Sequence, residues 1–234
     1  MTCVAIIPAR GGSKRILRKN IKEFCGKPMI AWSIEAAKAS GCFEQIIVST
    51  DDEEIASVSK AWGASVPFMR PANLSGDFTG TIPVIRHAVE WLNQNGVPVE
   101  YACCLYATAP FVSIEALQEG HRLIKDTGSS YAFSVTSFAF PIQRAIRITE
   151  NSRVAMFSPE HFQTRSQDLE DAWHDAGQFY WGTARAWCEE RLIFGEDSVP
   201  VKLPRHRVQD IDTPEDWIRA EWMFRAMQAS GGLQ

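Results

Sequence analysis

The chain has 234 residues, of which 45% are hydrophobic and 22% charged, and its formal net charge is -4 at pH 7. These values are typical of a folded globular protein and exclude the disordered, collagen-like and membrane-spanning classes. The acidic balance argues against a protein that coats nucleic acid. We expect one domain over residues 1–234, located in the cytoplasm, because residues 1–8 lack the charged region and cleavage site of a signal peptide.

The first half of the chain alternates short β-rich runs with helical patterns. The runs predict strands at 3–9, 45–50, 65–70, 101–107 and 130–136. The patterns between them predict helices at Pro28–Ser40, Asp52–Trp62, Thr79–Asn95 and Ser113–Asp126, with Asp52 and Ser113 suited to N-caps. Nearly continuous apolar strands that alternate with helices indicate an α/β fold, with a mostly parallel sheet covered by helices on both faces.

The pattern changes in the second half of the chain. From about 138 to 181 the segments FPIQRAIRI, RVAMFSP and AGQFYWG predict short antiparallel strands, which we interpret as an inserted arm. The earlier alternation then returns, with a predicted helix near 184–191, a strand at 198–204 and a closing helix from Pro214 to about Gln228.

A cluster of six cations directly follows the first predicted strand. The cations are Arg10, Lys14, Arg15, Arg18, Lys19 and Lys22. Gly11 and Gly12 precede most of them and could let backbone amides approach phosphate oxygens. The loop contains neither G-x-x-x-x-G-K-[ST] nor G-x-G-x-x-G, which excludes an ATPase P-loop and a dinucleotide fingerprint. A triphosphate site is therefore favoured over a solvated basic turn. Unshielded like charges repel one another, and folding alone gives no reason to cluster them.

This loop is expected to share one rim of the sheet with two other corners of the chain. Ligands of such sheets bind beyond the carboxyl ends of the strands. The rule places the basic loop beside Ser49-Thr50-Asp51 and Ala107-Thr108-Ala109-Pro110. Arg70 comes just before the next helix, where it could pair with phosphate or a base edge. Thr79 and Thr81 follow it, and their hydroxyl groups could equally cap the helix or contact a ligand.

Two carboxylates near the C-terminus suggest a metal site. Asp210 and Asp212 are two residues apart on an extended segment and so point to the same side. Paired carboxylates suit Mg²⁺ together with substrate phosphates, and the alternative is ordinary surface charge. Glu215 and Asp216 instead suit the first turn of a helix capped by Thr213. The six cysteines and five histidines show no spacing typical of a zinc site or a disulfide framework.

Several segments, in chain order, resemble the CMP-sialic acid synthetase (acylneuraminate cytidylyltransferase) family. They are IPARGGSKRILRKNI, GKPMIAWSI, STDDEEIA, RPANLSGD and DIDTPEDW. The resemblance covers nearly the whole chain. It implies a Rossmann-like nucleotide-diphospho-sugar transferase fold, CTP and an acidic nine-carbon sugar as substrates, Mg²⁺ as cofactor, and a homodimer whose dimerisation element is the arm at about 138–181.

The resemblance also implies a role for each matching position. The catalytic residues would be Arg10, Lys19 and Asp212. The nucleotide site would contain Arg10, Gly11, Gly12, Ser13, Lys19, Asn20, Arg70, Thr79 and Thr81. The sugar site would contain Tyr106, Gln178 and Tyr180, and the metal site Asp210 and Asp212. Leu17 stands where the family usually has proline, which predicts a more flexible basic loop.

Within the family, the LYATAPF and DAGQFYWG segments are most similar to members that activate pseudaminic acid. The implied reaction joins CTP and pseudaminic acid into CMP-pseudaminic acid and diphosphate. In it the anomeric hydroxyl of the sugar attacks the α-phosphate of CTP in line, assisted by Mg²⁺. The alternatives are an enzyme that activates sialic, legionaminic or Kdo-type acid, and a non-catalytic domain that binds nucleotide sugars.

Overall fold

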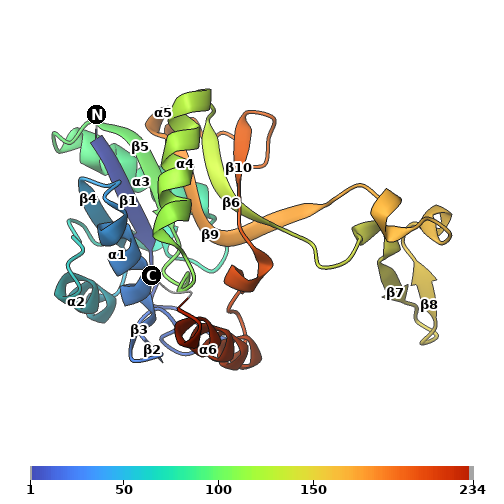
Figure 1. The fold of residues 1–234 in the computed structure, drawn as a ribbon. Helices are drawn as coiled ribbons and strands as arrows, with labels where there is room; N and C mark the ends of the chain where they lie inside the picture. The colour runs from blue at the N-terminus through green and yellow to red at the C-terminus, as the bar shows by residue number, and fades with distance from the viewer. Residues whose placement is uncertain (1, 232–234) are drawn as a thin grey trace.

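The computed structural model of the protein describes residues 2–231, so residues 1 and 232–234 of the predicted domain lie outside the described part. A six-stranded sheet forms its centre. The strands are β1 (Thr2–Pro8), β4 (Gln45–Ser49), β5 (Val99–Leu105), β6 (Tyr131–Ser137), β9 (Trp173–Thr183) and β10 (Ser198–Lys202). Their order across the sheet is β10-β6-β9-β5-β1-β4 (Figure 1).

The sheet is mostly parallel, as predicted. β1 pairs in parallel with β4 and β5, and β10 pairs in parallel with β6. β9 is antiparallel to both of its neighbours, β5 and β6, and so runs against the other five strands. The carboxyl ends of β1, β4 and β5 therefore meet at one edge, where a ligand site is expected.

Helices cover both faces of this sheet (Figure 1). α1 (Met29–Ser40), α2 (Glu53–Ala61) and α4 (Ile114–Thr127) contribute to one hydrophobic cluster with Ala5 and Ile7 of β1. α3 (Thr81–Gln94) and α5 (Ala184–Cys188) contribute to a second cluster with Val4 and Ile6. Successive side chains of β1 point to opposite faces, and both faces are buried, so the strand is apolar from Cys3 to Pro8.

Local signals explain most of the helix boundaries. Asp52 and Ser113 cap α2 and α4, as predicted, by accepting hydrogen bonds from backbone amides. α5 ends at Cys188, earlier than the predicted 191, and Glu190 has a positive φ of 53° that a helix cannot contain. Within residues 2–231, no helix is both long enough and apolar enough to cross a membrane.

The strand predicted at 65–70 is wrong. This segment makes two isolated bridges with β4, Ile47 to Ser65 and Thr50 to Met69. Pro67 lies between the bridges and has no N–H to donate to a neighbouring strand. The segment nevertheless runs along the edge of the sheet and delivers Arg70 to its carboxyl end.

The C-terminal helix α6 (Pro214–Ala229) packs on a third hydrophobic cluster, together with the hairpin of β2 (Glu23–Phe24) and β3 (Lys27–Pro28). Thr213 and Asp216 form a reciprocal capping box at its start. Phe224 and Trp217 of α6 pack edge-on against Phe24. Ile16 of the basic loop belongs to the same cluster, so the loop is anchored in the hydrophobic cluster that α6 helps to form.

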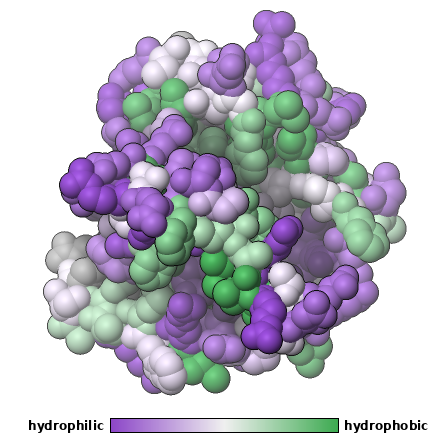
Figure 2. Space-filling model, turned by 90° about the vertical axis from the view of Figure 1, so that its right-hand side faces the viewer, coloured by the Kyte–Doolittle hydropathy of each residue, from purple (hydrophilic) through white to green (hydrophobic). Residues whose placement is uncertain are grey.

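An arm projects from the sheet after β6 and carries the hairpin of β7 (Ile146–Ile148) and β8 (Val154–Met156) (Figure 1). The arm ends before the predicted 181, because β9 begins at Trp173 and most of its length pairs with β5 and β6 in the central sheet. Nine of the sixteen exposed large apolar residues in the described chain lie between 138 and 173. Figure 2, which views the molecule from this side, shows apolar side chains at the surface among polar ones.

Candidate active site

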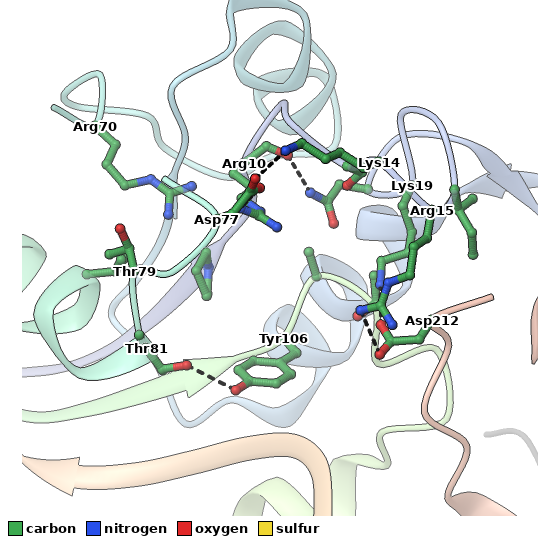
Figure 3. Close-up of a pocket in the computed structure, with 18 residues that line it drawn as sticks. Arg10, Lys14, Arg15, Lys19, Arg70, Asp77, Thr79, Thr81, Tyr106 and Asp212 are labelled. Carbon is green, nitrogen blue, oxygen red and sulfur yellow. Dashed lines mark hydrogen bonds and ion pairs between the residues drawn. The ribbon is translucent and has the colours of Figure 1, made fainter. Parts of the chain in front are cut away.

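A pocket of about 370 Å³ opens at the carboxyl ends of β1 and β5 (Figure 3). Its walls come from the basic loop, the segment leading into α3, the corner after β5, and Asp212 before α6. Five basic side chains line it: Arg10, Lys14, Arg15, Lys19 and Arg70. The pocket therefore lies on the predicted rim and offers a concentrated positive charge to an anionic ligand.

The two glycines of the basic loop have different roles. A Cβ on Gly11 would lie 2.7 Å from Asp52 Oδ2, so a larger residue would clash there. The Gly11 amide donates to Asp51 Oδ1 over 3.0 Å, and the Ser13 amide donates to the Gly11 carbonyl. A Cβ on Gly12 would meet no described atom within 4 Å. The backbone amides of Gly11 and Ser13 thus already donate within the protein, and Gly12 is where a ligand can approach the backbone.

Arg10 and Lys14 share one carboxylate, that of Asp77. Arg10 Nη1 lies 2.8 Å from Asp77 Oδ1, and the Lys14 ammonium group contacts Oδ2 of the same side chain. The hydrogen bond from Lys14, reinforced by Arg10, lowers the pKa of Asp77. An ionised carboxylate therefore lies against two of the cations that a phosphate would contact.

Arg15 and Lys19 share a second carboxylate, that of Asp212 (Figure 3). Arg15 Nη2 lies 2.9 Å from Asp212 Oδ2, and Lys19 Nζ lies 3.3 Å from Oδ1. Lys19 also donates to the Ile211 carbonyl over 2.7 Å. Two residues of the basic loop are thereby tied to the segment before α6, 192 or more positions along the chain.

Asp210 and Asp212 are close enough to affect each other. The pKa of Asp210 is raised by burial of its carboxyl group and then by the negative charge of Asp212. Two carboxylates with this repulsion fit a hard divalent cation. Within residues 2–231, no group of three or more His, Cys, Asp or Glu side chains is arranged to hold a metal. Any cation at the pair would therefore need further oxygen ligands from substrate phosphates or water.

The other two cations of the loop do not line the pocket. The Arg18 guanidinium donates to both carboxylate oxygens of Asp52, over 2.5 and 2.9 Å, and also contacts Glu54. This pairing lowers the pKa of Asp52 to about 2. Lys22 Nζ lies 4.4 Å from the centroid of a Trp217 ring. The expectation that all six cations serve the ligand is therefore corrected to four, because Arg18 and Lys22 fasten the loop to α2 and α6.

Arg70 is the most deeply buried cation of the pocket. Its side chain is 4% exposed, its Nε and Nη2 atoms have no hydrogen-bond partner among the described residues, and Nη2 lies 4.0 Å from Asp51 Oδ1. Burial lowers the pKa of Arg70. Asn20 is also buried and donates from Nδ2 to the Arg10 carbonyl over 2.9 Å. A buried guanidinium with unused donors favours a bound anion or base edge.

The opposite wall carries hydroxyl groups. The N-cap of α3 is Gly80, and no side chain caps this helix, so the structure does not use Thr79 or Thr81 as caps. Both threonines line the pocket. Thr81 Oγ1 lies 3.0 Å from the hydroxyl oxygen of Tyr106 (Figure 3). These side chains remain available to a ligand, as one of the two sequence interpretations expected.

Gln178 and Tyr180 lie behind this wall on β9 and do not line the pocket. Both are buried. Gln178 donates from Nε2 to the Arg207 carbonyl over 2.5 Å, and its Oε1 has no hydrogen-bond partner among the described residues. The ring of Tyr180 contacts that of Tyr106, with 5.4 Å between centroids. Of the three predicted sugar-binding residues, the structure thus places only Tyr106 on the pocket surface.

Sequence reasoning gave no individual role to three charged residues that line the pocket: Lys14 and Arg15, expected only as members of the six-cation cluster, and Asp77. The sequence shows Lys14 and Arg15 as part of the basic cluster. It does not show that these two line the pocket whereas Arg18 and Lys22 do not. Asp77 is 63 or more positions from its partners, and only the fold brings it to them.

The chain is similar in sequence to several known proteins. The family model described as cytidylyltransferase matches residues 4–193. The chain is 45% identical over 230 residues to a Campylobacter jejuni serotype O:2 protein named pseudaminic acid cytidylyltransferase, which covers 98% of this chain and 99% of the relative. It is 34% identical to a Legionella pneumophila protein named CMP-N,N'-diacetyllegionaminic acid synthase, with 97% and 98% of the two chains covered.

A solved structure shares the fold. CMP:2-keto-3-deoxy-manno-octonic acid synthetase, solved in complex with CTP, matches with a TM-score of 0.69 and 16% identity, over 97% of this chain and 99% of that chain. At this identity the likeness shows the fold alone, and it confirms the predicted α/β nucleotidyltransferase fold.

Proposed function

Because this chain belongs to the cytidylyltransferase family, we propose that it transfers CMP from CTP to pseudaminic acid and releases diphosphate. The assignment of CTP as a substrate rests on the pocket beyond β1, which has a volume of about 370 Å³ and is lined by five basic side chains. The assignment of pseudaminic acid rests on 45% identity, over 98% of the chain, to a relative named pseudaminic acid cytidylyltransferase.

The geometry supports catalysis by positioning and charge. The anomeric hydroxyl of the sugar attacks the α-phosphorus in line as diphosphate leaves, a reaction that needs little covalent chemistry from the protein. Arg10 and Lys19 both line the pocket and would meet the charge that develops on the leaving diphosphate. Arg70 gains most from a bound anion or base, because two of its donor atoms have no hydrogen-bond partner among residues 2–231.

We assign Asp210 and Asp212 to a Mg²⁺ ion that they would hold together with phosphate oxygens. The ion would supply positive charge next to the triphosphate when bound. Asp212 also orients Arg15 and Lys19 through its two ion pairs. Its carboxylate would therefore serve both the metal and the cations of the loop.

Replacing this carboxylate tests the assignment. Asp212→Asn is expected to lower kcat about 100-fold or more, because the metal and two oriented cations lose one ligand together. The measurement is diphosphate release across a Mg²⁺ titration, with Asp126→Asn, a surface carboxylate paired with Arg122, as the control. Full turnover of Asp212→Asn at low Mg²⁺ would contradict the assignment.

For the sugar, we propose a place beside Tyr106. Tyr106 and Thr81 join the phosphate side of the pocket to the corner after β5. Gln178 and Tyr180 would act from behind this surface, and the Gln178 Oε1 atom has no hydrogen-bond partner in the described part of the chain. The nucleotide would occupy the basic side of the pocket, which Ser13, Asn20 and Thr79 also line. Gly12 does not line the pocket, but its open backbone would let a phosphate approach.

We further propose that the arm mediates a homodimer. Its exposed apolar residues include Phe140, Ile148 and Phe162, which are 82%, 79% and 67% exposed. A surface with this many large apolar side chains on one thin extension is typical of an interaction site. A second copy of the chain is the partner that the family resemblance implies.

The decisive experiment is a diphosphate-release assay with CTP, Mg²⁺ and a panel of acid sugars. Pseudaminic acid is expected to have the highest kcat/KM, ahead of legionaminic, sialic and Kdo-type acids. Efficient turnover of one of the others, with little turnover of pseudaminic acid, would correct the sugar assignment and leave the cytidylyltransferase assignment intact. No diphosphate release with any acid would overturn the proposed reaction.

A further inference from the structure

An irregularity in β9 brings Asp175 next to Tyr180. Val135 of β6 pairs with Asp175, and Phe133 pairs with Tyr180, so two steps along β6 correspond to five along β9. Residues an odd number apart on a regular strand point to opposite faces. The extra residues form a bulge, and Gly177 within it has a φ of 61°, which glycine adopts without strain. The bulge reverses the alternation and turns the two side chains toward each other.

The Asp175 carboxylate uses both of its oxygens in this contact. Oδ1 accepts a hydrogen bond of 2.9 Å from the Gly177 amide, which fixes the carboxylate to the bulge itself. Oδ2 accepts a hydrogen bond from the Tyr180 hydroxyl group. Burial, followed by the nearby Tyr106 and Asp175, raises the pKa of Tyr180, so its hydroxyl stays protonated and acts as the donor.

Tyr180 in turn contacts the pocket wall. One side of its ring stacks near Phe133, with centroids 6.0 Å apart, and another side meets Tyr106 at 5.4 Å. Tyr106 lines the pocket and lies 3.0 Å, between hydroxyl oxygens, from Thr81. A continuous set of contacts therefore runs from Asp175, which is outside the pocket, to the surface beside which the sugar is placed.

We propose that Asp175 is a positioning residue that, through Tyr180, holds the Tyr106 ring in the orientation that accepts the acid sugar. The inference rests on the proposed function, and it concerns the sugar side of that site alone. Tyr180 is held by two ring contacts and one charge-assisted hydrogen bond. Ring contacts alone would let the Tyr180 ring shift in its plane. The hydrogen bond to Asp175 fixes the orientation of the Tyr180 ring, and Tyr106 packs against it.

The test compares two KM values for each variant. Asp175→Ala and Tyr180→Phe each break the same hydrogen bond, and each is expected to raise the KM for the sugar acid about tenfold. The KM for CTP is expected to stay within about twofold of the wild type, since the basic side of the pocket is untouched. Both changes remove the bond between Tyr180 and Asp175, and Asp175→Ala also removes the acceptor of the Gly177 amide, so the double variant is expected to resemble Asp175→Ala.

Two further variants separate positioning from loss of stability. Asp175→Asn keeps one acceptor oxygen for Tyr180 but none for the Gly177 amide, so it is expected to raise the sugar KM less than Asp175→Ala does. Tyr131→Phe removes another buried tyrosine hydroxyl, which donates to the Ala186 and Arg191 carbonyls away from the pocket, and is expected to leave both KM values unchanged. An unchanged sugar KM in Asp175→Ala and Tyr180→Phe, or equal rises in both KM values, would overturn the inference.

A crystal structure of Asp175→Ala tests the same inference without turnover. The Tyr106 hydroxyl is expected to leave Thr81, and an unmoved Tyr106 ring would overturn the positioning role. If the wild type prefers another acid of the panel, the two KM values are measured with that acid, so a wrong sugar assignment is distinguished from a wrong role for Asp175.

Discussion

Each of two aspartates at the pocket is shared by two cations of the basic loop. Asp77 contacts Arg10 and Lys14, and Asp212 contacts Arg15 and Lys19. These carboxylates offset the repulsion that four neighbouring cations would otherwise have. Asp212 also belongs to the proposed metal site, whereas Asp77 lies only against groups that a triphosphate would contact. Asp77 therefore competes with the phosphate for Arg10 and Lys14.

Asp77→Asn is accordingly expected to lower the KM for CTP about two- to fivefold, the range set by partly exposed ion pairs. The expected gain is larger at low salt, where charge interactions are less screened. Steady-state kinetics at two ionic strengths provides the measurement, with Asp126→Asn as a control remote from the pocket. A higher KM, or a loss of kcat, would mean that Asp77 assists the ligand and does not compete with it.

Asp52 is the residue whose charge fastens the loop to α2. It caps this helix and pairs with Arg18, whose φ of 55° is uncommon for a residue with a side chain. Its pKa of about 2 in the folded chain is below the value of about 3.9 for an unfolded aspartate. The unfolded state thus binds more protons between these values, and the contribution to stability is full above about pH 4 and lost as the pH falls toward 2.

Asp52→Asn keeps a capping side chain and removes the charge. Its free energy of unfolding is expected to be about 1–2 kcal/mol lower than that of the wild type at pH 7, and this difference is expected to shrink between pH 4 and pH 2. Asp52→Ala also removes the cap and is expected to lose about 1 kcal/mol more at each pH. Urea unfolding curves at pH 7, 4 and 2.5 measure both effects, and a difference independent of pH would contradict the assigned pKa.

Among the elements, α6 supports the ion pair between Arg15 and Asp212. Ile16 of the loop and Ile211, which precedes Asp212, are both buried in the cluster formed by Phe224 and Trp217. Arg15 and Asp212 are each next to one of these isoleucines. Packing against α6 therefore sets the distance between a cation of the loop and its carboxylate.

Phe224→Ala is expected to lower the free energy of unfolding by about 3–5 kcal/mol, the usual cost of a cavity left by a buried phenylalanine. It is also expected to raise the KM for CTP, because Ile16 and Ile211 lose a common support. Urea unfolding and steady-state kinetics measure the two effects. Trp222→Ala, on the exposed side of the same helix, is the control and is expected to change stability by no more than about 0.5 kcal/mol.

On the scale of the whole molecule, the arm is the part that the core does not need. Its hairpin pairs only with itself, and all three residues of β7 are exposed. By contrast, the central sheet is buried on both faces by its own helices. The exposed apolar side chains of the arm are thus left for another molecule, and the proposed second copy would bury them.

The double variant Phe140→Glu with Ile148→Glu is expected to be a monomer at concentrations where the wild type is a dimer, because buried charges without partners are costly. Sedimentation velocity measures the oligomeric state. Leu192→Glu, at a side chain 79% exposed outside the arm, is expected to remain a dimer. A monomeric wild type, or a double variant that stays dimeric, would contradict the role given to the arm.

Much of the fold was predictable because its signals are local. The periodicity of apolar residues, the caps at Asp52 and Ser113, and the capping box at Thr213 depend on neighbours within a few positions. The predicted strand at 65–70 failed because a local apolar pattern does not reveal that Pro67 interrupts pairing at a sheet edge. β9 was misplaced in the arm for a related reason, since its partners β5 and β6 are distant in sequence.

The sequence by itself determined the chemistry of this protein: a basic loop after the first strand, paired carboxylates near the C-terminus, and an anionic substrate between them. Only the tertiary structure decided which cations fasten the loop and which line the pocket. It separated Arg18 and Lys22, which fasten the loop, from the four loop cations that line the pocket. It also brought Asp77 and Asp175 to partners that no local pattern indicates. The physical reason is that charge and residue type are properties of single positions, whereas pairing and burial depend on distances that the packed core sets.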